Sequence, residues 1–157
     1  MKQELKQDFI RRLSQCNRGE LVVITYEILL VYIDDVENGI EAFDREKTRY
    51  SVNRAQDFLD ELISTLDFNY ELSDKLCKIY FYCKKQLSKA IYENKTDSVC
   101  EVKNIIEKLA DSFREAAKQD KSAPLMDNAQ QVYAGITYGR TDLNESCIDN
   151  SQRGFLA

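Results

Sequence analysis

Residues that interrupt helices are scarce in this chain, and this scarcity constrains its fold more than any other feature. The 157 residues include five glycines and one proline, and three of the glycines and the proline lie after Ser122. Glycine and proline are the residues that most disfavour a helix interior. We therefore expect the chain up to Ser122 to consist mostly of long helices, within one domain that carries a tail.

Apolar residues recur at alternating intervals of three and four in four successive segments, which places them on one face of each helix. Because the segments between them are short, consecutive helices are predicted to be antiparallel neighbours. The sequence thus predicts an all-α fold, an antiparallel up-down-up-down four-helix bundle over residues 16–119. The four predicted stripes are Val22, Tyr26, Leu29, Ile33, Val36, Ile40 and Phe43; Val52, Ala55, Leu59, Leu62 and Leu66; Leu72, Leu76, Ile79, Tyr80, Cys83, Leu87, Ala90 and Ile91; and Val99, Val102, Ile106, Leu109, Phe113 and Ala116.

Polar residues mark where the predicted helices begin. Asn17, followed three residues later by Glu20, resembles a capping box at the start of the first long helix. Asp44 can end that helix and cap the second one. Asn69 indicates a turn before the third helix, and Thr96 can cap the fourth.

Two segments lie outside the predicted bundle. Residues 1–15 are predicted to contain a short amphipathic helix, whose apolar residues Leu5, Phe9 and Leu13 are spaced by four. Residues 120–157 are predicted to form a C-terminal tail, in which the apolar residues between Leu125 and Tyr133 suggest another short helix.

The absence of histidine from the sequence excludes several classes of enzyme. Ser-His-Asp and Cys-His hydrolases, Cys/His zinc sites and Glu-x-x-His di-iron bundles all require it. The sequence also contains no glycine-rich phosphate loop. Its five cysteines are odd in number and form no C-x-x-C pair, so we interpret them as reduced thiols. We therefore expect no catalytic residue, no metal site and no cofactor.

Charge and hydropathy bear on the partners and the location of the protein. The formal net charge of −5 argues against binding to nucleic acid, which requires a surplus of Lys and Arg. The first eight residues are too charged for a signal peptide. The most apolar segment, residues 21–33, is shorter than the roughly 20 residues that a membrane-spanning helix needs. The sequence therefore predicts a cytoplasmic protein that does not insert into membranes.

The first long helix has more apolar surface than one stripe, and smaller excesses occur on the second and third helices. A helix that is apolar on most sides must be covered by something besides its bundle neighbours. Either the N-terminal helix and the tail provide this cover, or the surface is a groove for apolar helices of another chain, and an appendage can cover a groove until a partner displaces it. The candidate groove residues are Leu21, Ile24, Ile28, Val31, Phe58, Phe81 and Tyr82, and the candidate N-terminal cap consists of Leu5, Phe9 and Leu13.

Short motifs along three of the predicted helices follow a characteristic order. They are Glu20-Leu21 and Tyr26-Glu27 in the first long helix, Ala55-Gln56, Glu61-Leu62 and Leu66 in the second, and Ile79-Tyr80-Phe81-Tyr82, Leu87 and Ala90 in the third. In order and spacing, residues 14–118 resemble the FliS family of flagellin-specific export chaperones. The sequence departs from the family pattern at Arg18, Ile28 and Phe81, where the family commonly has proline, glycine and an acidic residue.

The resemblance implies a cytoplasmic export chaperone without catalytic activity. Such a protein would bind the C-terminal region of flagellin, prevent premature polymerisation and support flagellar type III secretion. The resemblance also makes other flagellar regulators and export components candidate partners. A disordered client that folds on binding needs a long apolar contact, which suits the excess apolar surface. The alternative interpretation is a helical adaptor or homo-oligomerising bundle unrelated to flagellin.

Overall fold

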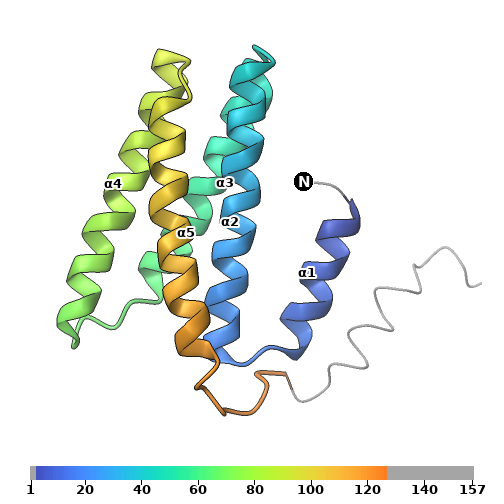
Figure 1. Ribbon diagram of the computed structural model, residues 1–157, viewed down its shortest axis with the longest axis vertical. Coiled ribbons are helices and arrows are strands. Elements are labelled where there is room, and N and C mark those ends of the chain that lie inside the picture. Colours follow the sequence, from blue (N-terminus) through green and yellow to red (C-terminus); the bar gives the residue numbers. More distant parts are fainter. Residues whose placement is uncertain (1–2, 127–157) are drawn as a thin grey trace, which may run out of the picture. The chain divides into compact units, whose positions relative to one another are not determined.

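The computed structural model describes residues 3–126, and within this range the protein has five helices and no strand (Figure 1). None of these helices is long and apolar enough to cross a membrane. The predicted all-α fold is confirmed, whereas most of the predicted short helix in the tail lies outside the described residues. The helices are α1 (Gln3–Gln15), α2 (Arg18–Glu41), α3 (Arg45–Ser64), α4 (Glu71–Glu93) and α5 (Asp97–Ala117).

Helices α2 to α5 pack in a closed cycle, while α1 stands outside it. Helix α2 contacts α3 and α5, and α4 contacts the same two helices from the other side. Helix α1 contacts only α2 among the helices (Figure 1). This arrangement is consistent with a four-helix bundle that carries one additional helix on α2.

Two of the three predicted helix caps are confirmed. The backbone N–H of Glu20 donates to Asn17 Oδ1 at 2.8 Å, and the N–H of Asn17 donates to Glu20 Oε2 at 3.1 Å, which completes a capping box. Asp44 Oδ1 accepts a hydrogen bond from the N–H of Lys47 at 2.9 Å. The prediction for Thr96 is wrong, because its backbone is already helical and its side chain makes no capping hydrogen bond. A capping side chain normally requires an extended backbone at that position.

Four residues of the predicted stripes are exposed and do not lie in the core: Phe43, Leu72, Ile91 and Ala116, the last two near the ends of α4 and α5. Phe43 is exposed because α2 ends at Glu41, and Phe43 adopts a positive φ of 53° in the turn that leads to α3. Leu72 is 61 % exposed, since it belongs to the first turn of α4 and lies at the edge of the bundle. Periodicity places a residue on the correct side of a helix but does not show where the core ends.

The centre of the bundle contains a polar link between two helices that are not neighbours in the cycle. The hydroxyl groups of Tyr26 in α2 and Tyr80 in α4 share a hydrogen bond, and both side chains are fully buried. The Tyr26 ring also packs against Phe113 of α5, with 5.4 Å between the ring centroids. Burial raises the pKa of Tyr26 and of Tyr80, so both hydroxyl groups stay protonated.

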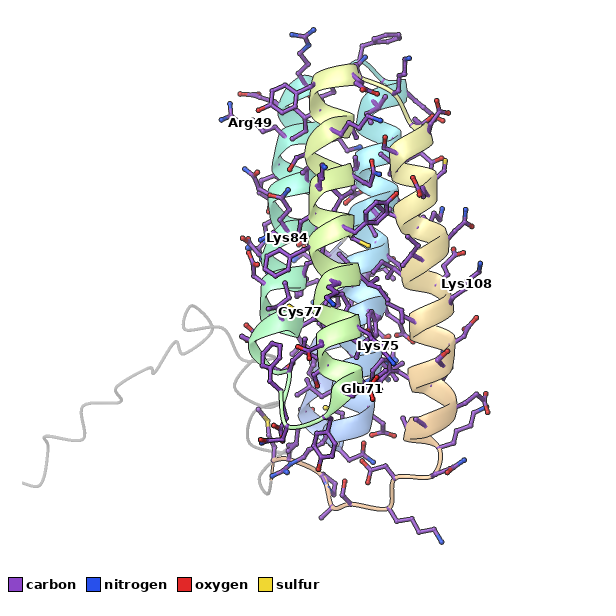
Figure 2. All side chains as sticks on the ribbon, turned by 90° about the vertical axis from the view of Figure 1, so that its left-hand side faces the viewer. Arg49, Glu71, Lys75, Cys77, Lys84 and Lys108 are labelled. Atoms are coloured by element: carbon purple, nitrogen blue, oxygen red, sulfur yellow. The ribbon has the colours of Figure 1, made fainter. Side chains whose placement is uncertain are left out.

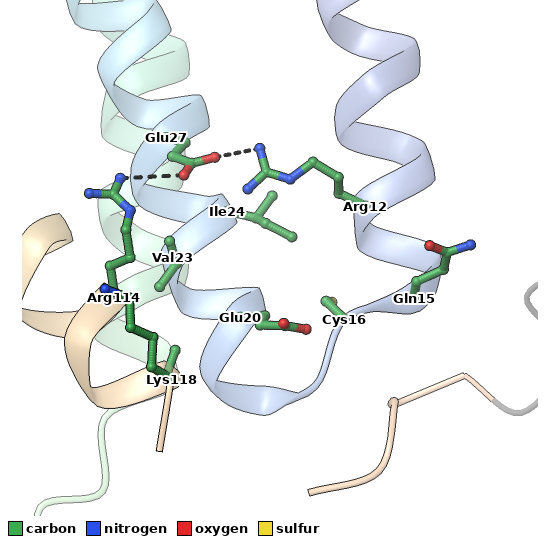
Figure 3. Close-up of a pocket in the computed structure, with 10 residues that line it drawn as sticks. Arg12, Gln15, Cys16, Glu20, Val23, Ile24, Glu27, Arg114 and Lys118 are labelled. Atoms are coloured by element: carbon green, nitrogen blue, oxygen red, sulfur yellow. Dashed lines mark hydrogen bonds and ion pairs between the residues drawn. The ribbon is translucent and has the colours of Figure 1, made fainter. Parts of the chain in front are cut away.

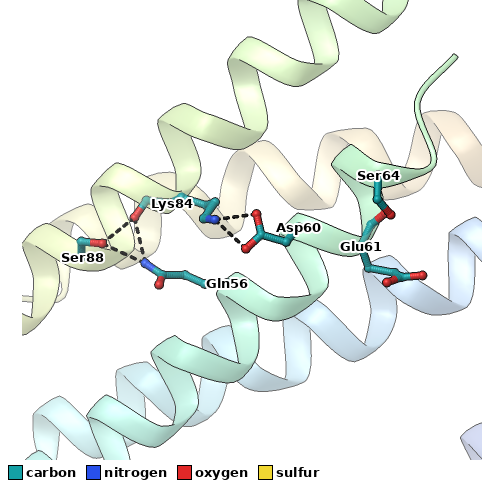
Figure 4. A network of polar contacts seen from close by, with 6 residues as sticks. All are labelled: Gln56, Asp60, Glu61, Ser64, Lys84 and Ser88. Carbon is teal, nitrogen blue, oxygen red and sulfur yellow. Dashed lines mark hydrogen bonds and ion pairs between the residues drawn. The ribbon is translucent and has the colours of Figure 1, made fainter. Parts of the chain in front are cut away.

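A second polar link joins α3 to α4 at the surface (Figure 4). The side-chain amide of Gln56 donates to the carbonyl oxygen of Lys84 at 3.2 Å and to Ser88 Oγ at 2.8 Å. One helical turn further along α3, Asp60 accepts a hydrogen bond from Lys84 Nζ at 2.7 Å. These contacts fix how α3 and α4 are aligned along their length.

We expect Tyr80→Phe to lower the free energy of unfolding by about 1–3 kcal/mol, because it leaves the buried Tyr26 hydroxyl without a partner. The double variant Tyr26→Phe/Tyr80→Phe should be destabilised by less than the sum of the two single variants, since it removes both hydroxyl groups. Urea unfolding of the four proteins measures this coupling. Strictly additive losses would show that the hydrogen bond contributes nothing to stability.

Candidate partner-binding surface

One apolar face of α2 points away from the centre of the bundle. Leu21, Ile24, Ile28 and Val31 are spaced by three and four residues, so they share one side of the helix, roughly opposite to Tyr26. Ile24 is only 2 % exposed, Ile28 is also buried, Val31 is half-buried and Leu21 is exposed. Something other than α3 and α5 must therefore cover the middle of this face.

Helix α1 supplies that cover. Phe9 of α1 is buried in the same apolar cluster as Ile24 and Ile28, and Leu13 packs against this cluster. Ile24 lies between α2 and α1 in the close view of the structure (Figure 3). Leu5, the third residue of the candidate cap, remains 43 % exposed. The half of α1 nearest α2 in sequence is thus the better anchored half.

A single carboxylate connects three helices beside this contact. Glu27 of α2 pairs with Arg12 of α1, with 2.6 Å between Oε2 and Nη1, and with Arg114 of α5, with 3.4 Å between Oε1 and Nη2 (Figure 3). The hydrogen bond to Glu27 raises the pKa of the Arg12 guanidinium. Because these side chains are partly exposed, each pair contributes about 0–1 kcal/mol.

A cavity of about 450 Å³ lies between α1, the first turns of α2 and the end of α5 (Figure 3). Its walls mix apolar and charged groups, which suits side chains of a partner protein. Burial raises the pKa of the Cys16 thiol at its edge, so the thiol is not an activated nucleophile. Nowhere in residues 3–126 do three His, Cys, Asp or Glu side chains group together in a way that could hold a metal ion. The cavity is lined by Arg12, Gln15, Cys16, Glu20, Val23, Ile24, Glu27, Arg114, Ala117 and Lys118.

The chain that follows α5 holds the link between α1 and α2 in place. Asp120 Oδ2 accepts a hydrogen bond from the N–H of Gly19 at 3.2 Å, and the N–H of Leu125 donates to the carbonyl oxygen of Cys16 at 3.0 Å. A Cβ atom at Gly19 would lie 3.1 Å from the same Asp120 oxygen. Glycine at this position allows the close approach, a role that the sequence alone did not reveal.

The remaining candidate residues fall into two groups. Phe58 of α3 is half-buried and stacks on Tyr32 of α2, with 5.7 Å between ring centroids, so it adjoins α2. Phe81 and Tyr82 are exposed residues of α4, which lies diagonally across the bundle from α2 and meets it at the buried Tyr26–Tyr80 hydrogen bond, so the structure does not bring them to the α2 face. We therefore distinguish two surfaces. The α2 surface comprises Leu21, Ile24, Ile28, Val31 and Phe58, and the α4 surface comprises Phe81 and Tyr82 together with the exposed Lys78 and Lys85.

The fold and these surfaces define a helical bundle in which a short N-terminal helix covers an apolar face of α2. The chain matches the FliS family, described as flagellar protein FliS, over residues 1–120. It is also similar to the flagellar secretion chaperone FliS of Bacillus subtilis (strain 168). The two are 29 % identical over 103 residues, which cover 66 % of this chain and 77 % of the relative. This chain belongs to the FliS family, and the resemblance found in its motifs is confirmed.

We expect Arg12→Ala to loosen α1 without unfolding the bundle. Loss of the pair with Glu27 should speed amide hydrogen exchange in α1, while the melting temperature changes little because a partly exposed ion pair contributes little. Arg11→Ala is the matched control, since Arg11 pairs with Asp8 inside α1 itself. Equal exchange in the two variants would show that the Arg12–Glu27 pair does not hold α1.

Proposed function

We propose that this protein is a cytoplasmic export chaperone that binds the C-terminal region of flagellin, prevents its premature polymerisation and supports flagellar type III secretion. Membership of the FliS family and the name of the Bacillus relative support this class of function. The observation that supports a binding site on α2 is the apolar face of this helix, which is buried under the separate short helix α1. We also propose the up-down-up-down order of α2 to α5, supported by the short connections and the course of the ribbon in Figure 1.

We assign the client to the α2 surface. A client helix with apolar residues at intervals of three and four could pack on Ile24 and Ile28, as α1 does in the free protein. A client that is disordered before binding loses conformational entropy when it folds, so its affinity must come from a large contact of about 1,000–3,000 Å². The α2 surface would supply part of that area, and its flank at Phe58 extends it toward α3.

Helix α1 acts in this proposal as a displaceable cap. With 13 residues it is too short to be stable alone, so it stays helical only while it is docked. It contacts one helix, and its anchoring rests on Phe9, Leu13 and the Arg12–Glu27 pair. Because the cap belongs to the same chain, its effective concentration is high and even a weak contact competes with a client.

Isothermal titration calorimetry with the C-terminal segment of flagellin from the same cell tests the client assignment. Binding should have a negative heat-capacity change and should increase the helical circular dichroism, because apolar area is buried and a coil is ordered. An absence of binding heat at two temperatures and tens of micromolar protein would overturn the assignment.

Substitutions at the rim of the α2 surface test the position of the site. We expect Leu21→Asp and Val31→Asp each to weaken client binding about tenfold, or about 1.4 kcal/mol, with a small change in melting temperature. Ile106→Ala is the control, since Ile106 is fully buried in the bundle core. It should lower stability by about 2–5 kcal/mol and leave client affinity unchanged under conditions where the protein is folded. The reverse pattern would place the client elsewhere.

Removal of residues 1–14 tests the cap. We expect the truncated protein to bind an apolar dye more strongly and to bind the client more tightly, by tenfold for each 1.4 kcal/mol of competition that is lost. If α1 is instead a permanent part of the core, truncation will lower the melting temperature and leave client affinity unchanged or weaker. Calorimetry on the full-length and truncated proteins, with light scattering to detect self-association, distinguishes the two outcomes.

A further inference from the structure

The outer side of α4 carries a charge unlike that of the chain as a whole. Between Lys75 and Tyr92 the sequence has five lysines and no aspartate or glutamate, although the formal net charge of the protein is −5. A positive segment on an acidic protein is a local feature that general solubility does not require.

Three of these lysines already have carboxylate partners. Lys75 pairs with Glu71 at 2.8 Å, Lys89 with Glu93 at 3.7 Å, and Lys84 reaches across to Asp60 of α3 (Figure 4). In the described part of the chain, the other two lysines, Lys78 and Lys85, are exposed and make no ion pair.

Two acidic groups on the helices beside α4 are engaged by residues of α4. Lys84 of α4 pairs with Asp60 of α3, and the hydroxyl of Tyr82 donates to Glu101 Oε1 of α5 at 2.6 Å. The amide of Gln86 donates to the same hydroxyl at 2.7 Å, which fixes the Tyr82 ring. The flanks of α4 are therefore tied to α3 and α5, and the charges of Lys78 and Lys85 remain available to a partner.

An exposed aromatic ring lies between the two available lysines. Phe81 follows Lys78 by three residues and precedes Lys85 by four, so the three side chains share one face of α4. Phe81 is 56 % exposed, and Lys78 and Lys85 are two turns apart, or about 10 Å along the helix axis. Figure 2 shows the bundle from the side on which α4 lies in front.

We propose that the α4 surface is a docking site for an acidic amphipathic helix of a partner protein. An apolar side chain of the partner packs on Phe81, and carboxylates one turn to either side pair with Lys78 and Lys85. The sign of the two unpaired charges selects an acidic partner, and the exposed ring selects one with an apolar anchor. Because α4 and α2 are not neighbours in the bundle and these two surfaces lie on separate helices, this site and the α2 surface can be occupied at the same time.

Two other classes of anionic partner fit the observations less well. Recognition of an anionic membrane by a basic segment typically uses four to eight lysines or arginines, whereas two are unpaired here. A nucleic acid would present many phosphates to a protein whose net charge is negative. A single acidic helix matches the two charges and their spacing.

Fluorescence anisotropy of the full-length protein with a labelled synthetic peptide tests the proposal. The probe is an amphipathic helix of about five turns, with leucine along one stripe and glutamate beside it, and the comparison peptide has glutamine in place of glutamate. We expect the glutamate peptide to bind, with an affinity that falls as the salt concentration is raised from about 50 to about 300 mM. The glutamine peptide should bind about tenfold more weakly.

Variants locate the binding. We expect Lys78→Glu/Lys85→Glu to weaken binding of the glutamate peptide at least tenfold, and Phe81→Ser to weaken it severalfold. Lys108→Glu is the matched control, because Lys108 is an exposed lysine that points outward from α5, away from α4, and should not affect the peptide (Figure 2). Circular dichroism and melting curves establish that each variant is folded. Binding that survives the double substitution, or falls equally with Lys108→Glu, would overturn the proposal.

Two further measurements separate this proposal from its alternatives. Co-sedimentation with vesicles of phosphatidylserine and phosphatidylcholine that is lost in the double variant, without any binding of the glutamate peptide, would overturn it in favour of a lipid surface. Repeating the anisotropy with saturating flagellin C-terminal segment should leave peptide affinity unchanged, and displacement of the peptide would show that the α4 surface belongs to the client site. If the protein does not bind the flagellin segment but still binds the glutamate peptide, the proposed chaperone function is refuted and the α4 docking site is not.

Discussion

The structure depends on the need to bury a helix that is apolar on more than one side. Helix α2 packs its Tyr26 side into the bundle and still has Ile24 and Ile28 on roughly the opposite side. Two neighbours in a bundle cannot cover both sides, so α2 requires a third, which is α1. Helix α1 buries this second apolar side of α2, and it is also the least attached element in the described chain. It therefore combines a structural role with a position suited to regulation.

Apolar stripes alone would allow several arrangements of four similar helices, and the polar links reduce that number. The hydrogen bond between Tyr26 and Tyr80 is satisfied only when α2 and α4 face each other across the centre. The contacts of Gln56 with Lys84 and Ser88 are satisfied only in one alignment of α3 with α4. Because an unpaired buried polar group is costly, the Tyr26–Tyr80 bond favours one arrangement over its competitors. The contacts of Gln56 at the surface add a smaller preference.

The helices and most of their starting points could be predicted from the sequence, because periodicity and capping are local properties. Asn17 and Asp44 cap helices as predicted. Four residues were wrongly placed in the core, since periodicity does not show how far a core extends: Phe43, Leu72, Ile91 and Ala116. The excess of apolar residues predicted that α2 needs a cover and made Leu5, Phe9 and Leu13 a candidate cap, but left open whether the N-terminal helix, the tail or a partner provides the cover. The grouping of Phe81 and Tyr82 on a separate surface, and the pairing of Glu27 with two arginines, depend on the packing of distant segments and could not be predicted.

If α1 is displaced by a client as proposed, the short link between α1 and α2 has a consequence for the kinetics of that exchange. Cys16 and Asn17 are the two residues between the helices, and both are held, one by Leu125 and the other by the capping box. The end of α1 at this link is thus its fixed end, and the exposed Leu5 lies near the opposite end. A client that replaces α1 would first contact the α2 surface near the free end of α1. It would then displace α1 from that end toward the link, one helical turn at a time. In such a stepwise exchange α1 need not dissociate completely before the client binds. Helix α1 could therefore be bound tightly at equilibrium and still be replaced quickly.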